Sequence, residues 1–289
     1  MALPPSQILA QIQESLALRA PAMIVTIYGD IVVPRGGELW MGTLVEICGC
    51  LGISETLVRT AVSRLVAAGQ LVGERDGRRS YYRLAPGART EFATAARLLY
   101  GPRAEATGFL IHHAPGLAEE VVRRARLGRM GPDLYLRPRH QDGMKLSGLT
   151  FSADVEADGE ALAAYAAGLW DLAAFDADYR AMIDLFAPLL DAQETGTPLS
   201  SADAVVARLL LVQAYRAVLL RDPRLPAAAL PANWPGPAAR RLFARLYRSL
   251  SPMADSHVGA NFIGRDDPLP AETNETRERL RSLADEPNS

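Results

Sequence analysis

The chain has 289 residues, of which 49% are hydrophobic and 22% charged, and its formal net charge is −2. This length suggests two or three domains with sizeable cores, and the near-neutral balance excludes a globally basic nucleic-acid binder. Lys145 is the only lysine, so nearly all basic residues are arginines. Arginine suits bidentate contacts with phosphate and guanine, although a GC-rich genome would favour the same composition.

Neither a secretion signal nor a membrane span is predicted. Residues 1–20 lack the charged start and long apolar core of a signal peptide, and no apolar run reaches the roughly 18 residues that span a membrane. Cys48 and Cys50 have neither disulfide-framework nor metal-site spacing, and we expect both to be small buried apolar residues. We therefore expect a cytoplasmic protein with no membrane partner.

Hydrophobic periodicity predicts a mixed α+β fold that is mostly helical, with three domains and a tail. The expected helices cover residues 6–18, 40–51, 55–68, 90–100, 116–128, 160–192, 201–222 and 238–250; the expected strands cover 71–84 as a hairpin, 108–114, 134–139 and 149–154. The domains are then 1–88, 89–157 and 158–264. Residues 265–289 are polar, acidic and Pro-containing, and we expect a mobile tail.

The two helices at 40–51 and 55–68 carry the strongest functional pattern. A tight turn at Gly52 joins them, Ser54 suits the N-cap of the second helix, and Gly69 suits a left-handed C-cap. On a helical wheel, Leu57, Val58, Ala61, Val62, Leu65 and Val66 fall on one half, and Thr56, Arg59, Thr60, Ser63 and Arg64 on the other. The second half holds hydroxyls and arginines and no acid. It can donate to phosphates and to guanine in a major groove, although an ordinary solvated face could look the same.

The hairpin that follows strengthens this interpretation. Asp76-Gly77 is its expected two-residue turn. Between residues 59 and 83 there are six arginines and two acids, a local charge of +4. A helix-turn-helix followed by an arginine-rich hairpin is the winged arrangement, with Arg75, Arg78 and Arg79 where a wing tip contacts the DNA backbone. One of Tyr81 and Tyr82 packs under the wing and the other offers its hydroxyl to phosphate, but alternation does not say which. We predict binding to duplex DNA.

These residues resemble PaaX-type repressors of phenylacetate catabolism. The motifs that carry the resemblance are Gly29-Asp30, "PRGG", "VRTAVSRL" and "GRRSYYRL" near the N-terminus, and "YRAVLLRDPRLPAAALPANWPGPAA" near the C-terminus. They cover about half of the chain. The resemblance implies that the N-terminal winged helix-turn-helix is followed by a small ferredoxin-like middle domain, similar to CRISPR-associated nucleases, and a helical C-terminal domain for effector binding and dimerisation.

The resemblance also implies a function. Such repressors act as homodimers on palindromic operators and leave the DNA when phenylacetyl-CoA binds. The matching recognition-helix positions are Arg59, Thr60, Ser63 and Arg64, and the matching wing positions are Gly77, Arg78, Arg79, Ser80 and Tyr82. The middle segment "LLYGPRAEATGFLIHHAPG" matches less well. The effector is therefore phenylacetyl-CoA or a different acyl-CoA or aromatic ligand, and no cofactor is expected.

Two regions are candidates for the effector. Residues 121–145 hold seven basic side chains (Arg123, Arg124, Arg126, Arg129, Arg137, Arg139, Lys145) against Asp133 and Asp142. The phosphates of a CoA ester suit such a cluster, with Arg137 and Arg139 foremost, although a solvated face or an auxiliary DNA contact would look alike. In the helical domain, Arg216 with Trp234 forms the second candidate; Trp234 could equally be structural and pin its Pro-rich loop.

Other functions have weaker support. A metal-dependent nuclease needs paired carboxylates, but the strand at 108–114 ends without an acid and Asp154 is isolated. His112 and His113 point to opposite faces of a strand, so they make a poor metal site. We predict no catalytic or metal-binding residue. A co-regulator that binds protein through its amphipathic helices is a third possibility, but a homodimer on two half-sites fits better.

Overall fold

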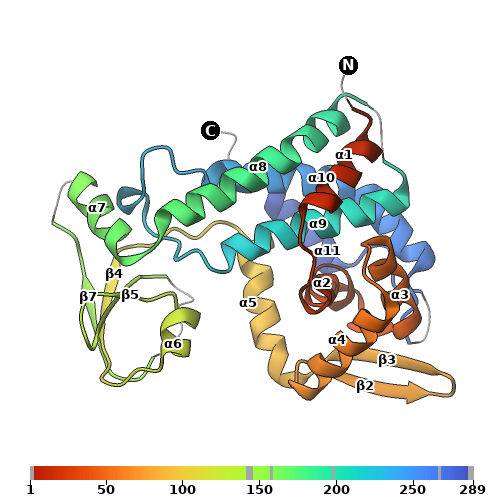
Figure 1. Ribbon diagram of the computed structural model, residues 1–289, viewed down its shortest axis with the longest axis horizontal. Helices are drawn as coiled ribbons and strands as arrows, with labels where there is room; N and C mark the ends of the chain where they lie inside the picture. The colour runs from red at the N-terminus through yellow and green to blue at the C-terminus, as the bar shows by residue number, and fades with distance from the viewer. Residues whose placement is uncertain (1–2, 141–145, 157–158, 197–198, 266–267, 286–289) are drawn as a thin grey trace. The chain divides into compact units, whose positions relative to one another are not determined.

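The computed structural model describes residues 3–140, 146–156, 159–196, 199–265 and 268–285 (Figure 1). As predicted, the fold is mixed α and β and mostly helical. The chain forms two compact units. Unit 1 comprises residues 1–102, 182–217 and 238–289, and unit 2 comprises residues 103–181 and 218–237. No helix in the described part is both long and apolar enough to cross a membrane.

This division differs from the predicted domains 1–88, 89–157 and 158–264. The predicted boundary after residue 157 lies outside the described residues. The helices expected to form a separate C-terminal domain are divided instead between the two units. Periodicity shows that a helix has an apolar face, but it does not show which distant element covers that face.

The N-terminal part of unit 1 alternates helices with a small sheet. Its elements are α1 (Pro5–Ser15), α2 (Ala20–Ile27), a π-helical turn (Tyr28–Val32), a 3₁₀ turn (Val33–Arg35), β1 (Glu38–Trp40), α3 (Met41–Cys50), α4 (Glu55–Ala67), β2 (Leu71–Asp76), β3 (Arg79–Leu84), a second 3₁₀ turn (Pro86–Ala88) and α5 (Arg89–Tyr100). The sheet is antiparallel with the order β1-β3-β2. The three-residue strand β1 was missed, because so short a segment has no measurable alternation.

The remainder of unit 1 is helical. Both α8 (Leu172–Glu194) and α9 (Ser201–Leu219) pass from one unit to the other along the chain, and α10 (Gly236–Asn261) and α11 (Asn274–Ala284) follow. The prediction of a mobile tail from residue 265 was wrong for α11, since Thr276, Arg279 and Leu283 are buried. Thr273 caps this helix in a capping box with Thr276. The sequence concealed the helix because most of its anchoring side chains are polar.

A buried ion-pair network lies at the centre of unit 1. Arg208 Nε on α9 lies 3.0 Å from Asp30 Oδ2, and its Nη1 donates to Asp255 Oδ1 at 2.6 Å. Arg35 Nη2 donates to the same Asp255 oxygen at 2.6 Å. All four side chains are almost fully buried. The network therefore joins α9 and α10 to the "GD" and "PRGG" motifs of the N-terminal segment.

Further partners complete the environment of Asp30. Tyr100 and Tyr247 donate their hydroxyls to Asp30 Oδ1 at 2.9 and 2.8 Å. Arg279 on α11 donates to the carbonyl oxygens of Gly29 and Asp30 at 3.1 and 3.2 Å. Burial alone would raise the pKa of Asp30, but Arg208, Arg279 and the two tyrosine hydroxyls outweigh it, and the pKa lies below its ordinary value.

Unit 2 contains a four-stranded antiparallel sheet with the order β5-β6-β4-β7. Its elements are β4 (Phe109–His113), α6 (Glu119–Arg124), β5 (Gly128–Arg129), β6 (Leu134–Pro138), β7 (Leu149–Ala153) and α7 (Gly159–Leu169), with a 3₁₀ turn at Ala227–Ala229. Phe109, Leu136, Trp170 and Leu225 form its main core. Gly128 permits the close approach of Trp170, because an added Cβ would lie 2.7 Å from the indole ring.

We expect Asp30→Asn to lower the free energy of unfolding at pH 7 by about 3–5 kcal/mol, because Arg208 would lose a buried counter-charge. Urea denaturation measures the loss. In Asp178→Asn, which alters an exposed pair with Arg221, the loss should stay below about 1 kcal/mol.

The pH dependence supplies a second readout of the same variant. The depressed pKa of Asp30 gives stability that is complete above its unfolded-state value and is lost as pH falls through its folded-state value. The difference between wild type and Asp30→Asn should therefore shrink in acid. A difference that did not change with pH would contradict the role given to Asp30.

Candidate DNA-binding surface

The turn between α3 and α4 has the predicted backbone. Gly52 takes a positive φ of 76°, and the amide of Ile53 donates to the carbonyl of Cys48 at 2.9 Å. At the other end of α4, Gly69 has φ 66°, and the amide of Gln70 returns to the carbonyl of Leu65 at 2.9 Å. Both glycines are thus needed for φ > 0. Ser54 occupies the N-cap position, but its side chain makes no capping hydrogen bond, so its hydroxyl stays exposed beside the first turn.

One face of α4 packs into unit 1 and the opposite face is exposed. The buried residues are Val58, Ala61, Val62 and Leu65, and the predicted DNA-contacting residues Thr56, Arg59, Thr60, Ser63 and Arg64 are all exposed. The wheel was wrong for two apolar residues. Leu57 is 57% exposed and Val66 is 39% exposed. Both lie at the edges of the apolar half, which is broader than the stripe that the core covers.

Arg59 is held by a neighbour on its own helix. Its guanidinium lies 2.7 Å from Glu55, one turn earlier, and both side chains are 57% exposed. Exposed i,i+4 pairs contribute only a few tenths of a kcal/mol, about 0.3–0.5. A phosphate or a guanine can therefore displace Glu55 at little cost. In the absence of such a ligand, the ion pair with Glu55 keeps the guanidinium of Arg59 on the exposed face of α4.

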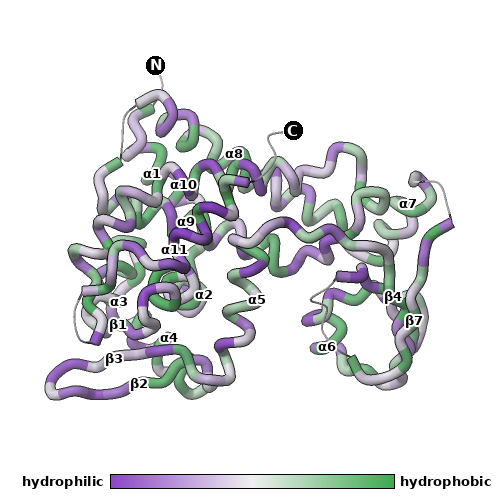
Figure 2. Tube along the Cα trace, turned by 180° about the vertical axis from the view of Figure 1, so that it is seen from behind, coloured by the Kyte–Doolittle hydropathy of each residue, from purple (hydrophilic) through white to green (hydrophobic). Residues whose placement is uncertain are grey.

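The hairpin β2–β3 projects a strongly polar tip (Figure 2). Asp76 pairs with Arg79, so Gly77-Arg78 is the two-residue turn and the predicted Asp76-Gly77 turn was one residue early. Gly77 supplies the positive φ of 57°. The side chains of Arg75, Arg78 and Arg79 are exposed, as predicted. Arg79 lies over the ring of Trp40 at 4.9 Å.

The two tyrosines of the hairpin differ in burial, which answers the question of which one packs inward. Tyr81 is only 4% exposed and packs under the sheet, whereas Tyr82 is half-buried. The ring of Tyr82 lies over Gly73, where an added Cβ would approach it to 2.6 Å. Ser80 is half-buried opposite Arg75. Tyr82 and Ser80 thus stay partly accessible on the hairpin.

Arg265 links the hairpin to β1, a role that no pattern in the sequence predicted. Arg265 Nε donates to Glu38 on β1 at 2.6 Å, and its Nη2 lies 2.7 Å from Glu74 on β2. Its guanidinium lies over the ring of Tyr81 at 5.5 Å. The carbonyl of Ile263 also accepts from the amide of Trp40 at 2.9 Å. Arg265 thereby joins two strands of the sheet.

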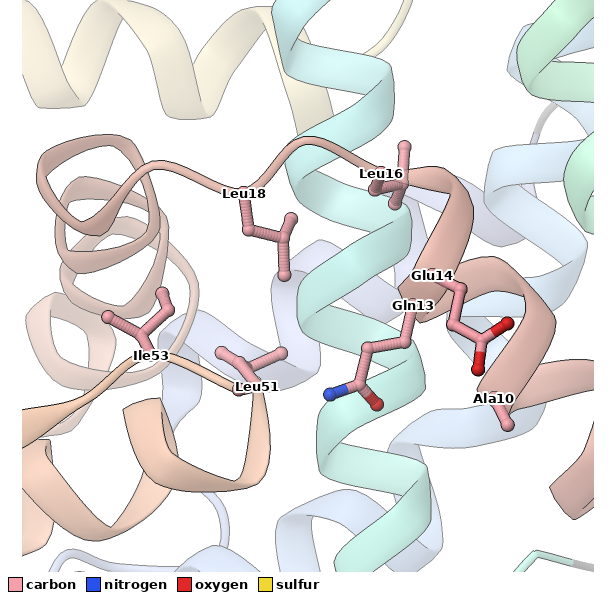
Figure 3. Close-up of a pocket in the computed structure, with 8 residues that line it drawn as sticks. Ala10, Gln13, Glu14, Leu16, Leu18, Leu51 and Ile53 are labelled. Atoms are coloured by element: carbon pink, nitrogen blue, oxygen red, sulfur yellow. The ribbon is translucent and has the colours of Figure 1, made fainter.

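A hollow of about 450 Å³ lies between α1 and the turn that precedes α4 (Figure 3). Leucine and isoleucine side chains line it together with Gln13 and Glu14; they are Leu16, Leu18, Leu51 and Ile53. Gln13 crosses to the turn and donates to the carbonyl of Cys50 at 2.9 Å. This contact attaches α1 to the turn that sets the direction of α4.

The four candidate effector residues are distributed over both units. Arg137 and Arg139 lie on or beside β6 in unit 2, and burial lowers the pKa of Arg137. Arg139 donates to the carbonyl of Thr107 at 2.7 Å. Arg216 and Trp234 belong to different units. Lys145 and Asp142, which complete the basic cluster in the sequence, lie outside the described residues.

Arg216 and Trp234 each have partners within their own unit. Arg216 donates to Thr26 and to Gln213, both at 3.3 Å, and burial lowers its pKa. Trp234 packs edge-on against Tyr179, with ring centroids 6.0 Å apart, and covers the core of unit 2.

The structure shows the burial of two histidines and of the two cysteines, and the hydrogen bonds of His112. His112 is buried between Thr150 Oγ1 at 2.7 Å and the carbonyl of Ser147 at 2.8 Å, while His113 is exposed, as the alternation predicted. Burial raises the pKa of the Cys48 thiol to about 12. Cys50 is exposed, contrary to expectation, because it lies at the open end of α3. The described residues contain no group of three potential metal ligands.

Comparison with known proteins agrees with this arrangement. Residues 19–88 match the family model "PaaX-like protein", and residues 170–260 match "PaaX-like protein C-terminal domain". The chain is 32% identical over 261 residues to "Transcriptional repressor PaaX" of Escherichia coli (strain K12), covering 82% of each. The first match includes α3, α4 and the hairpin β2–β3, so the protein is of the PaaX-like class. The chain belongs to the PaaX family.

A solved structure shows a related fold. "Uncharacterized protein Rv0674 from Mycobacterium tuberculosis" superposes with a TM-score of 0.52 at 21% identity, over 83% of this chain and 99% of that one. At this identity the likeness concerns the fold alone.

We expect Arg265→Ala to loosen the hairpin, because it removes both ion pairs and the ring contact at its base. Hydrogen exchange of the β2 and β3 amides should accelerate at least about threefold, while α3 amides keep their rates. The control is Arg281→Ala, which removes an exposed pair with Glu278 on α11 and should leave the hairpin unchanged. Equal rates in wild type and Arg265→Ala would refute the fastening role.

Proposed function

We propose that this protein is a transcription repressor that binds duplex operator DNA through a winged helix-turn-helix, with α4 as the recognition helix and β2–β3 as the wing. The observation that carries the proposal is the exposed face of α4, where hydroxyls and arginines stand over a packed apolar stripe. The chain order α2-β1-α3-α4-β2-β3 and the sheet order β1-β3-β2 support it. The repressor relative supports it further.

Each part of this surface has a separate task. The recognition helix enters the major groove, where Arg59 and Arg64 donate to guanine acceptors and the hydroxyls of Thr60 and Ser63 contact base edges or phosphates. The wing tip neutralises backbone phosphates through Arg78 and its neighbours Arg75 and Arg79. Two copies related by a two-fold axis would place two such helices on the half-sites of a palindrome.

The effector is part of the same proposal. We propose that an aryl- or acyl-CoA ester, with phenylacetyl-CoA as the first candidate, releases the protein from its operator. The anionic phosphates of CoA suit the arginines of unit 2, where the sheet order β5-β6-β4-β7 supports a small ferredoxin-like domain. Burial already lowers the pKa of Arg137, and a desolvated guanidinium gains more from an anion than an exposed one does.

The first test concerns the wing. Arg78→Ala and Arg79→Ala should each reduce the magnitude of the slope of log K against log salt by about 1.8, because each removes one phosphate contact in each of the two half-sites. Arg59→Ala and Arg64→Ala should cost about 1–3 kcal/mol on the operator and relax its sequence preference. Fluorescence anisotropy at several salt concentrations measures both quantities, with a duplex selected by the protein from a random pool.

The control for this test is Arg281→Ala, an exposed arginine on α11. Its binding should equal that of wild type. If all four α4 and hairpin variants bind as the control does, α4 is not the recognition helix and the hairpin is not its wing.

The second test concerns the effector. In the double variant Arg137→Ala/Arg139→Ala, the phenylacetyl-CoA concentration that releases half of the bound DNA should rise at least about tenfold, since two charge-assisted contacts are lost. The control is Arg221→Ala, in which the exposed partner of Asp178 in the same unit is removed. Thermal unfolding verifies that loss of the contact between Arg139 and Thr107 has not destabilised the protein and thereby altered the release of DNA. Unchanged release in the double variant would place the effector elsewhere.

A further inference from the structure

The more exposed of the two large apolar side chains on the surface of α4 lies near the N-terminal end of the helix. Leu57 is the third residue of α4 and is 57% exposed. Thr56 precedes it, and Thr60 and Arg64 follow three and seven residues later along the same stripe of the helix surface. Leu57 thus lies at the edge of the polar face, beside Arg64 on one side and the buried stripe on the other.

In a recognition helix, the position of Leu57 determines which group of the DNA it can contact. Helix-turn-helix proteins contact base edges with the N-terminal residues of that helix. Most groups presented by the major groove are hydrogen-bond donors or acceptors, which arginine and hydroxyl side chains can satisfy. The apolar exception is the C5-methyl group of thymine. A leucine makes no hydrogen bond, so the complementary feature for Leu57 is a methyl group.

We propose that Leu57 is a specificity-determining residue that packs against a thymine methyl in each operator half-site. The inference rests on the proposed DNA-binding function and adds a residue that the wheel had assigned to the core. Contact with a methyl would remove apolar surface of Leu57 from water only in the complex with the right base pair, so it discriminates between sequences.

The same helix supplies a matched control. Val66 is also apolar and 39% exposed, but it lies nine residues further on, about half a turn round the helix and near its C-terminal end. A truncation there changes the apolar surface of α4 without touching the base-reading end. Both residues are exposed, so neither truncation opens a cavity in unit 1.

The experiment replaces thymine by deoxyuridine, which lacks the C5-methyl and keeps every hydrogen-bonding group. A duplex is selected from a random pool by the wild-type protein, and each half-site thymine is then replaced in turn. Wild type and Val66→Ala should lose about fourfold in affinity at one thymine, the value for one buried methyl. Leu57→Ala should bind the thymine duplex more weakly and show no further loss with deoxyuridine.

Each outcome is decisive. Equal deoxyuridine sensitivity in wild type and Leu57→Ala would overturn the contact, as would an operator on which no thymine shows methyl dependence. Equal affinity of Leu57→Ala and wild type for the thymine duplex would overturn it as well. If the wild-type protein selects no sequence at all, the proposed function itself fails; that result is distinguishable from selection without methyl dependence.

Discussion

The buried charges around Asp30 constrain unit 1 more than any other interaction. A carboxylate and a guanidinium removed from water cost several kcal/mol each unless every partner is in place. Asp30 therefore depends on Arg208 and on two tyrosine hydroxyls at once. These partners come from α5, α9 and α10. A shift of any of these helices would therefore leave a charged group buried in the core without its partner. The N-terminal helices are held in one arrangement as a result.

A short series of packing contacts connects Asp30 to the candidate DNA-binding surface. Asp30 lies in the π-helical turn that continues α2, and α2 packs against α3 and α4. Arg35 and Arg279 donate to carbonyl oxygens within that turn, those of Ile31 and Gly29. Arg265 fastens the hairpin to β1 in turn. The orientation of α4 and the position of the hairpin β2–β3 are thus fixed by residues far away in the chain, as a preorganised binding surface requires.

The sequence predicted those features that depend on local chemistry. Gly52 and Gly69 were identified because only glycine tolerates their backbone at no cost, and the polar face of α4 followed from its period. The errors arose where tertiary packing decides. A wheel divides a helix into halves, but the core covers a narrower stripe, and Leu57 falls outside it. The role of Arg265 was missed because its ion pairs with Glu38 and Glu74 are remote in sequence and leave no periodic signal, and α11 was missed because most of its buried side chains are polar.

The location of the arginines explains how a chain of net charge −2 can present a basic surface. Arg35, Arg208, Arg240 and Arg279 are buried and satisfy carboxylates or carbonyl oxygens. Asp30 and Asp255 offset part of this charge inside unit 1, and the four buried guanidiniums are not accessible to a phosphate at the surface. Arg64, Arg75 and Arg78 are exposed on α4 and the hairpin. A count of arginines over the whole chain mixes the two groups, whereas the salt dependence of DNA binding would depend only on the second. Local charge on one face is therefore the better guide to binding than the total.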